Sequence, residues 1–433
     1  MKMIHNKILI DLKNDKHEYL LVNLLYGLVD VLTESDVAII KKWEETGTFS
    51  PNGNYEQNLY NALQSRFYFL NPTEEKVLRD KIIESHNMEL EKRLTSSKSA
   101  SFIFSYACNF ACPYCYEKNR NNEHQIMTTD MIDVVISLYT DGIDHIGFFG
   151  GEPLLPQNEK LIRYVISKVP NAFYTIITNG YYLDYFLPIF KNVNLAMIQI
   201  TLDGNREQHN KTRILANGKP TYDKILQNIQ LCIDNKIPVK IRMNLSKDNA
   251  GVCFDTRKEL ISKFGNKYLF FEMQPLFDYS YKEQTDFLSS MLNSDAESSS
   301  KNMLWHTLPQ ISNFIMNKTS IRPTIRFCES EEQNRFYDCY GNIYSCILSV
   351  GEKNKSIGSF YPSLTLKKNS LLSYDITKNQ ICNECNYALI CGGGCPYHIM
   401  NDDGKIVGTN CQNIKNEIDN FIPLLYKHVY GGQ

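Results

Sequence analysis

Three closely spaced cysteines are the residues of this sequence that most directly indicate chemistry. Cys108, Cys112 and Cys115 follow the apolar run 101–106, and their short gaps let three thiolates meet at one compact inorganic centre. A [4Fe–4S] cluster has four irons, so three protein ligands leave one iron free to bind a small molecule. A zinc site and packed free thiols are the alternatives, but tetrahedral zinc needs a fourth ligand, and the local sequence offers none before His124.

The cysteine motif, Cys-x3-Cys-x-aromatic-Cys with Tyr114 in the aromatic position, resembles the signature of the radical SAM superfamily. The resemblance implies that S-adenosylmethionine (SAM) chelates the free iron through its amino and carboxylate groups. It also implies that one electron from the cluster breaks the sulfonium and releases a 5′-deoxyadenosyl radical. We therefore expect the three cysteines to hold the SAM-binding cluster.

A glycine-rich turn and several polar residues extend this resemblance along the chain. The turn Gly150-Gly151-Glu152-Pro153 follows the apolar run 145–149, and relatives use such a turn to hold the amino group of SAM. Glycines let backbone carbonyls approach a ligand closely, and a carboxylate complements an ammonium. In relatives an arginine pairs with the SAM carboxylate, a task for which bidentate geometry favours Arg over Lys. The other SAM-binding candidates, including that arginine, are Tyr114, Thr178, Asn179, Arg213 and Asn244.

A second set of cysteines, with Gly341 at a fixed position between the first two, resembles the SPASM domain of peptide-modifying radical SAM enzymes. The resemblance implies two auxiliary [4Fe–4S] clusters, and three clusters in all. The nearer auxiliary cluster is expected to have either Cys339 as a fourth ligand or an open iron. Its three other ligands are Cys328, Cys346 and Cys395, and the farther cluster has Cys382, Cys385, Cys391 and Cys411.

Residues 1–90 are expected to form a small N-terminal domain. Strands are predicted at 7–12 and 19–25, and helices at 33–43, 54–66 and 73–94, with Val37, Ile40 and Trp43 at helical spacing on the first helix. This order resembles a winged-helix-like domain that captures the leader of a precursor peptide by pairing it with a strand edge. A purely structural cap is the alternative.

Residues 98–280 alternate between predicted strands and helices. Six such units favour an α/β fold with a partial (β/α)6 barrel, and the SAM-binding candidates that follow strands lie where parallel barrels place their chemistry. A connector is expected at 281–320, with a polar stretch at 294–300 and a helix at 308–317, and a SPASM domain at 321–433. Strands are predicted at 101–106, 145–149, 173–178, 196–202, 239–244 and 268–274, and helices at 129–140, 158–168, 182–190, 221–235 and 254–264.

Composition limits the partners. The net charge is −2 with no charged block, which argues against a nucleic-acid surface, and neither a signal peptide nor a run long enough to span a membrane is present. We therefore expect a soluble, cytoplasmic protein. Thirteen cysteines in such a chain favour metal binding over disulfides, although Cys232 and Cys253 are expected to be buried free thiols.

The resemblance implies an enzyme that abstracts a hydrogen from a ribosomally made precursor peptide and installs a thioether, C–C or C–O cross-link with loss of two hydrogens. Its partners would be the precursor peptide with its leader and an external electron donor such as flavodoxin or ferredoxin. An anaerobic sulfatase maturase is one alternative, but Ile347 stands where that family has its aspartate base after the position of Cys346. A non-catalytic iron–sulfur protein that binds a peptide or senses redox state is another. The sequence identifies no catalytic base, and Glu272 is not assigned to that role.

Overall fold

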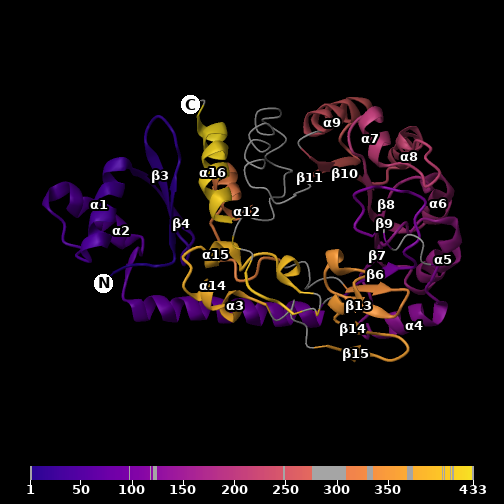
Figure 1. Ribbon diagram of the computed structural model, residues 1–433, viewed down its shortest axis with the longest axis horizontal. Coiled ribbons are helices and arrows are strands. Elements are labelled where there is room, and N and C mark those ends of the chain that lie inside the picture. Colours follow the sequence, from indigo (N-terminus) through magenta and orange to yellow (C-terminus); the bar gives the residue numbers. More distant parts are fainter. Residues whose placement is uncertain are drawn as a thin grey trace.

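Three groups of elements follow one another along the long axis of the molecule. The computed structural model describes residues 2–96, 98–117, 119, 124–246, 249–275, 309–328, 335–367, 374–401, 403, 405–409, 411 and 414–431. Figure 1 places the N-terminal elements at one end, the parallel sheet with its helices at the other, and the C-terminal helices between them. Within these ranges no helix has the length and apolar character needed to cross a membrane.

A parallel sheet forms the centre of residues 98–275, and it confirms the predicted partial barrel. Its six strands pair in chain order, from β6 to β11, and the helices that alternate with them cover the outside (Figure 1). The strands are β6 (Ser99–Ile103), β7 (His145–Phe148), β8 (Phe173–Thr178), β9 (Asn194–Thr201), β10 (Val239–Leu245) and β11 (Leu269–Pro275). The helices are α4 (Thr129–Ser137), α5 (Glu159–Lys168), α6 (Leu183–Phe190), α7 (Arg206–Thr212), α8 (Tyr222–Asp234) and α9 (Ala250–Phe264).

Helix α7 was not predicted from the sequence. Its seven residues are almost all polar, and only His209 is buried, so no apolar period marks it. It begins instead on a side-chain cap, because the Asn205 side-chain oxygen accepts a hydrogen bond from the Gln208 backbone N–H at 3.0 Å.

The C-terminal region continues the barrel sheet beyond β6. Strand β12 pairs with β6 in parallel, with Asp338 opposite Ile103, and the next three strands add in antiparallel order. These strands are β12 (Arg335–Asp338), β13 (Asn342–Tyr344), β14 (Gly358–Ser359) and β15 (Thr365–Leu366). One sheet therefore connects the first cysteine loop with the region that holds the second cysteine set.

The N-terminal elements contain three strands that were not predicted, β4 and the short strands β1 and β5. A three-stranded antiparallel sheet has the order β2-β3-β4, and helix α1 begins on the expected cap, with Thr33 and Asp36 hydrogen-bonded to each other's backbone N–H. The elements are β1 (Lys2–Met3), β2 (Lys7–Asp11), β3 (Glu18–Asn23), β4 (Leu28–Thr33), α1 (Glu34–Thr46), α2 (Gly53–Ser65), β5 (Phe69–Leu70) and α3 (Pro72–Ser96).

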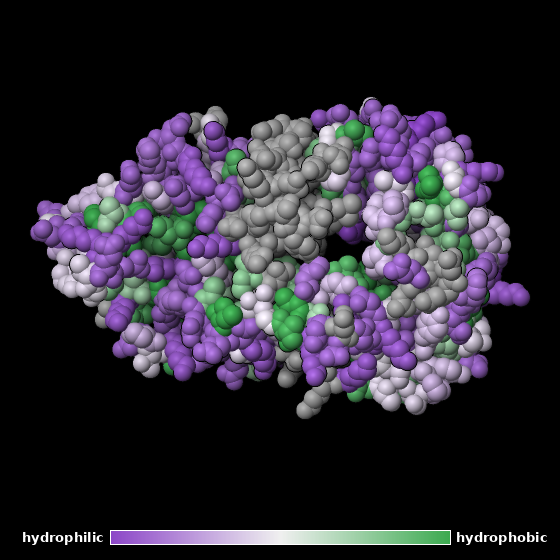
Figure 2. All heavy atoms as spheres, in the orientation of Figure 1, coloured by the Kyte–Doolittle hydropathy of each residue, from purple (hydrophilic) through white to green (hydrophobic). Residues whose placement is uncertain are grey.

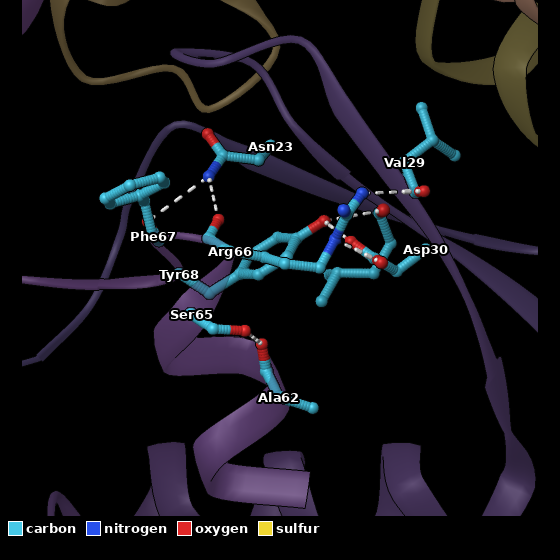
Figure 3. Close-up of polar contacts among 9 residues, drawn as sticks. Asn23, Val29, Asp30, Ala62, Ser65, Arg66, Phe67 and Tyr68 are labelled. Atoms are coloured by element: carbon cyan, nitrogen blue, oxygen red, sulfur yellow. Dashed lines mark hydrogen bonds and ion pairs between the residues drawn. The ribbon is translucent and has the colours of Figure 1, made fainter.

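Strand β4 was missed because Asp30 interrupts its apolar sequence. The structure gives this carboxylate two partners that the sequence pattern does not reveal (Figure 3). The Tyr68 hydroxyl donates to Asp30 Oδ2 at 2.9 Å, and the Arg66 guanidinium forms an ion pair with Oδ1. Both partners come from the end of α2 and the residues after it, so they hold β4 against the helices.

The C-terminal helices pack against the N-terminal sheet. Helix α16 contacts β2 and α12, the Asn386 amide donates to the Lys7 carbonyl at 3.1 Å, and Arg79 of α3 donates to the Cys382 carbonyl at 3.4 Å. The elements are α12 (Pro309–Asn317), α14 (Gln380–Asn383), α15 (Ala388–Cys391) and α16 (Ile414–Tyr430), and α12 confirms the helix predicted at 308–317. The rest of the expected connector, 281–308 with its polar stretch at 294–300, lies outside the described residues.

Candidate active site

The first cysteine loop follows β6 and is fixed by the segment that follows α7. Phe110 and Leu215 form an isolated bridge, the Ala111 N–H donates to the Ile214 carbonyl at 2.9 Å, and the Ala216 N–H donates to the Asn109 carbonyl at 2.9 Å. Within the loop, the Cys115 N–H donates to the Cys112 carbonyl at 3.2 Å. Backbone pairing thus fixes the shape of the loop.

The three thiols of this loop lie close enough to affect one another. Burial raises the pKa of Cys108 to about 12, and the negative charges of Glu152, Cys112 and Cys115 contribute to the rise. Burial also raises the pKa of Cys112 and of Cys115. Thiols in such a setting become thiolates when a cation is bound among them, because a coordinating metal removes the proton. The setting therefore fits a metal cluster.

The glycine turn touches this loop directly. A Cβ added to Gly151 would lie 2.3 Å from the Tyr106 carbonyl oxygen and 2.5 Å from that of Ala107, and the Glu152 N–H donates to the Ala107 carbonyl at 2.9 Å. Gly150 has φ of +107°, a conformation that favours glycine. The sequence explained the glycines by close approach to a ligand, whereas the structure shows that Gly151 makes room for the backbone just before Cys108.

Glu152 is buried, with 1% of its surface exposed, and connects two strand ends. Its Oε1 accepts from the Thr178 hydroxyl at 2.6 Å and from the Leu154 N–H at 2.8 Å, and its Oε2 accepts from the Asn179 N–H at 2.7 Å. Burial raises the pKa of Glu152 to about 6, against the effect of these hydrogen bonds. Thr178 and Asn179 therefore hold the carboxylate in place, and their own contact with SAM stays a prediction.

The remaining residues of the turn and of the β8 end support this arrangement. The Asn179 amide donates to the Asn109 side-chain oxygen at 2.7 Å, which links β8 to the cysteine loop. The Pro153 carbonyl accepts from the Asn158 amide at 3.1 Å, where the chain turns toward α5. The structure thus brings the cysteine loop, the glycine turn and the β8 end into one hydrogen-bonded unit.

Arg213 joins a buried network that the sequence did not reveal. Its NH1 donates to the Tyr114 hydroxyl at 2.9 Å, that hydroxyl donates to Asp203 Oδ2, and the Thr212 hydroxyl donates to the same oxygen at 3.0 Å. The guanidinium also lies over the Phe110 ring, 5.7 Å from its centroid. The Asp-Gly pair after β9, at 203–204, was the available signal, but it gave no partner for Asp203.

The polar groups of this network fit the amino-acid part of SAM. Among the described residues, the Arg213 Nε, one Asn109 amide nitrogen and Asp203 Oδ1 are buried without a hydrogen-bond partner. Burial opposes the charge of Arg213, but Tyr114, Cys112 and Asp203 together raise its pKa, so it stays a cation. A buried donor of a cation suits a carboxylate, and a buried carboxylate oxygen suits an ammonium.

Asn244 lies apart from these contacts, at the end of β10. It is buried, its side-chain oxygen accepts from the Arg242 Nε at 3.2 Å, and its carbonyl accepts from the Asn249 amide at 2.9 Å. Strand β11, which pairs with β10, carries Glu272, and this residue forms ion pairs with Lys240 at 3.0 Å and Arg242 at 3.3 Å. On the face drawn in Figure 2, an opening lies beside the barrel, with apolar residues along part of its visible rim.

Four cysteines of the second set come together. Burial raises the pKa of Cys391 to about 12 and that of Cys382 to about 11, and charges on Cys385 and Cys411 contribute to both rises. The first three cysteines lie on or beside the short helices α14 and α15, and the Cys385 N–H donates to the Cys382 carbonyl at 3.3 Å. This grouping agrees with the four ligands expected for the farther cluster.

Among the other cysteines of the second set, Cys346 and Cys395 have a neighbour in common. Charges on Cys346 and Cys395 both contribute to the raised pKa of Tyr397, whose leading cause is burial, so these two thiols lie near one ring. Cys339 is buried beside Tyr106, and Cys328 is half-buried. Cys232 and Cys253 are buried, as predicted.

No three Cys, His, Asp or Glu side chains in the described ranges are gathered tightly enough to hold a single metal ion. A [4Fe–4S] cluster binds its ligands at separate irons, so its thiolates stand further apart than those around one ion.

Comparison with known families identifies the class of protein. The sequence pattern of the Radical SAM superfamily matches residues 102–249, the segment that holds the cysteine loop, the glycine turn and Arg213. The chain therefore contains a radical SAM domain, and a cysteine-rich C-terminal region follows it. Its cofactors are those of the superfamily, SAM and [4Fe–4S] clusters.

The relatives of known name share parts of the chain. A GTP 3′,8-cyclase of Clostridium perfringens (strain SM101 / Type A) is 32% identical over 148 residues, which are 33% of this chain and 44% of the cyclase. The match thus spans less than half of that relative. A cysteine-type anaerobic sulfatase-maturating enzyme of Clostridium novyi (strain NT) is 24% identical over 341 residues, or 69% of this chain and 88% of that enzyme.

Two solved structures share the fold. Native anSMEcpe with bound AdoMet has a TM-score of 0.58 at 18% identity, covering 77% of this chain and 100% of that chain. Streptococcus suis SuiB bound to the precursor peptide SuiA has a TM-score of 0.53 at 14% identity, covering 94% of this chain and 98% of that chain. The SuiB likeness thus includes nearly the whole chain.

Proposed function

We propose that this protein is a peptide maturase that removes two hydrogens from a ribosomally made precursor peptide and joins two of its residues. The observation that carries the proposal is the presence of two sets of neighbouring cysteines. Three cysteines lie beside the glycine turn and four lie in the C-terminal region, and one sheet connects the two regions. When bound, SAM and the first cluster supply a 5′-deoxyadenosyl radical. A further metal centre gives the second electron of the oxidation a destination.

The residues of the site have separate tasks in this proposal. Cys108, Cys112 and Cys115 hold the first cluster, and the Glu152 carboxylate, fixed by three hydrogen bonds, faces the amino group of SAM. Arg213 holds the SAM carboxylate through its unpartnered Nε, while Tyr114 keeps the guanidinium in position. Cys328, Cys346 and Cys395 hold the nearer auxiliary cluster, and Cys382, Cys385, Cys391 and Cys411 hold the farther one.

The net change removes two hydrogens from the peptide. One hydrogen atom would leave a peptide carbon and end in 5′-deoxyadenosine, and that carbon would bond to a sulfur, carbon or oxygen of another residue, which loses a proton. The cysteines of the C-terminal region would hold the centres that take up the remaining electron and pass it to an external carrier of the flavodoxin or ferredoxin type.

Strand β4 of the N-terminal domain, residues 1–90, is the proposed holder of the peptide leader. It is the outer strand of its sheet, because β2 at the other edge contacts α16. The Val29 carbonyl accepts from Arg66 at 3.3 Å (Figure 3), and the Thr33 N–H donates to Asp36 at 2.9 Å. Since backbone direction alternates along a strand, Val31, with 52% of its surface exposed, presents its N–H and carbonyl to the same edge.

A substitution at Val31 tests the capture of the leader. Val31→Pro removes the edge N–H, and proline is tolerated on edge strands. Val31→Thr keeps both the N–H and the branched shape, so it serves as the matched control. We expect weaker binding of a fluorescent leader peptide to the proline variant only. Equal affinity of both variants and the native protein would make the domain a structural cap.

The alternative of a sulfatase maturase has less support here. Cys346 is followed by Ile347, which is exposed at the start of a short helical turn and has no group that takes up a proton. The N-terminal domain would also lack a purpose in that reaction.

Mass spectrometry of co-expressed peptides tests the reaction itself. The protein is produced without oxygen together with short peptides encoded beside its gene. A peptide lighter by two hydrogens, with fragmentation blocked between two residues, is the expected result. Cys112→Ala should yield no product and no SAM cleavage, whereas Cys395→Ala should retain some SAM cleavage without product. An unchanged peptide beside active SAM cleavage would refute the peptide proposal.

A further inference from the structure

Asp338 is a fully buried carboxylate at the end of β12 that serves neither the SAM site nor a cysteine directly. Its Oδ1 accepts from the N–H groups of Tyr340 at 3.0 Å and Asn342 at 2.8 Å, and so shapes the turn between β12 and β13. Its Oδ2 accepts from the hydroxyls of Tyr106 at 3.0 Å and Tyr344 at 3.1 Å, and from the Asn342 amide at 3.2 Å. The two oxygens thus have different tasks.

The two tyrosines that meet at Oδ2 come from different parts of the sequence. Tyr106 stands two residues before Cys108, and Tyr344 stands two residues before Cys346. Both side chains are fully buried, so neither hydroxyl has water as an alternative partner. One oxygen atom therefore joins the segment that leads to the first cluster with the segment that leads to the nearer auxiliary cluster.

We propose that Asp338 is a positioning residue that sets the separation between the SAM-binding cluster and the nearer auxiliary cluster. The proposal rests on Cys108 and Cys346 as cluster ligands, which is part of the proposed function, but not on the identity of the peptide. The parallel pairing of β12 with β6 brings the two segments side by side, and the shared oxygen fixes their ends. A substrate radical formed at one cluster must pass its electron to the other, so this separation governs how often a radical leads to product.

Variants can separate the two tasks of Asp338. Asp338→Asn keeps an oxygen for the turn but places an amide donor against the two phenol donors, which breaks the link. Tyr106→Phe and Tyr344→Phe each remove one hydroxyl and leave the carboxylate. The matched control is Tyr139→Phe. The half-buried Tyr139 hydroxyl lies 3.0 Å from that of Tyr337 in β12 and donates to the Ser99 carbonyl in β6 at 2.8 Å, so it joins the same two strands, yet it leads to no cysteine.

The primary measurement is the distance between the two reduced clusters, obtained by pulsed EPR on the full chain with all clusters loaded. We expect a longer or broader distance distribution in Asp338→Asn, Tyr106→Phe and Tyr344→Phe, and an unchanged one in Tyr139→Phe. The second measurement is the amount of 5′-deoxyadenosine formed per product. Because a misplacement of about 1 Å can cost about 100-fold in rate, we expect this ratio to rise at least about tenfold in the same three variants.

The outcomes distinguish this proposal from the function on which it rests. A native protein that binds iron but shows only one cluster signal would refute both. A native protein with separate clusters and variants with native distances would refute the positioning role and leave the function standing. If Asp338→Asn does not fold, the two tyrosine variants decide, since each removes a single oxygen atom.

Discussion

Gly151→Ala is the substitution for which the structure gives the clearest expectation. The new Cβ would lie 2.3 Å from the Tyr106 carbonyl oxygen and 2.5 Å from that of Ala107, whereas real Cβ atoms essentially never approach another heavy atom within 3.0 Å. The turn and the cysteine loop must therefore separate by about 0.7 Å. Both obstacles are backbone atoms that directly precede Cys108, so the clash cannot be relieved by rotating a side chain.

The separation should affect both stability and SAM chemistry. Overpacking of this kind costs about 1–3 kcal/mol of the free energy of unfolding. The displacement also moves Glu152 away from the Ala107 carbonyl, to which its N–H donates at 2.9 Å. The Glu152 carboxylate, the proposed contact of the SAM amino group, therefore shifts relative to the cluster. With about 1 Å of misplacement costing about 100-fold, we expect SAM cleavage to fall between about tenfold and 100-fold.

Gly251→Ala provides the matched control for this prediction. Gly251 lies in α9 with no heavy atom within 4 Å of the added Cβ, and neither glycine has a positive φ. Alanine in a helix stabilises by about 0.5–1 kcal/mol relative to glycine, so the two variants should shift the melting temperature in opposite directions. The assay is the rate of 5′-deoxyadenosine formation under reducing conditions, with iron content measured in parallel. Equal rates and equal melting temperatures for both variants would refute the reasoning.

Two further predictions concern buried ionisable groups. Glu152→Gln removes the charge and places an amide donor against at least one of the donors that now meet the carboxylate. Because a hydrogen bond to a charged group contributes about 1.5–3 kcal/mol, the Kd for SAM should rise at least about tenfold. Titration calorimetry with SAM measures this change, and an unchanged Kd would exclude the contact between Glu152 and SAM. His209 is fully buried, and burial, with the nearby charge of Arg213, lowers its pKa to about 3 from 6.5. The neutral ring is thus favoured in the folded state, and the stability that this provides is present above pH 6.5 and lost as the pH falls toward 3, by roughly 1 kcal/mol at pH 5.5. Urea unfolding at pH 7.5 and pH 5.5 should show this loss in the native protein and not in His209→Gln, and parallel losses in both would contradict the assignment.

The sequence predicted the barrel well because its signals are local. Each strand of the parallel sheet contains buried apolar residues, and each covering helix apart from α7 has an apolar face, so periodicity marked five helices and six strands close to their observed bounds. Strand β4 and helix α7 were not predicted because the contacts that define them are polar. Asp30 needs Arg66 and Tyr68, and α7 needs the Asn205 cap, and neither partnership leaves a periodic pattern.

The candidate site was predictable as a set of residue types and not as a set of contacts. The cysteine spacings identified both sets of cysteines, but the roles of the residues around them depend on contacts between loops that are distant in the sequence. Thr178 and Asn179 were expected at SAM, yet their observed partner is Glu152. The sequence assigned no role to Asp203, although its carboxylate accepts a hydrogen bond from the Tyr114 hydroxyl, which itself accepts one from Arg213.

The link between the two cysteine regions shows why such contacts lie beyond sequence patterns. Strand β12 pairs with β6 although more than 200 residues separate them, and no spacing rule connects a strand at 99 with one at 335. Once that pairing exists, Asp338 stands opposite Ile103, and the tyrosines before Cys108 and Cys346 come within reach of one carboxylate. Main-chain pairing between β12 and β6 therefore places the segment that leads to Cys346 beside the segment that leads to Cys108. It follows that a change at β12 should alter the passage of the electron between the two cysteine regions.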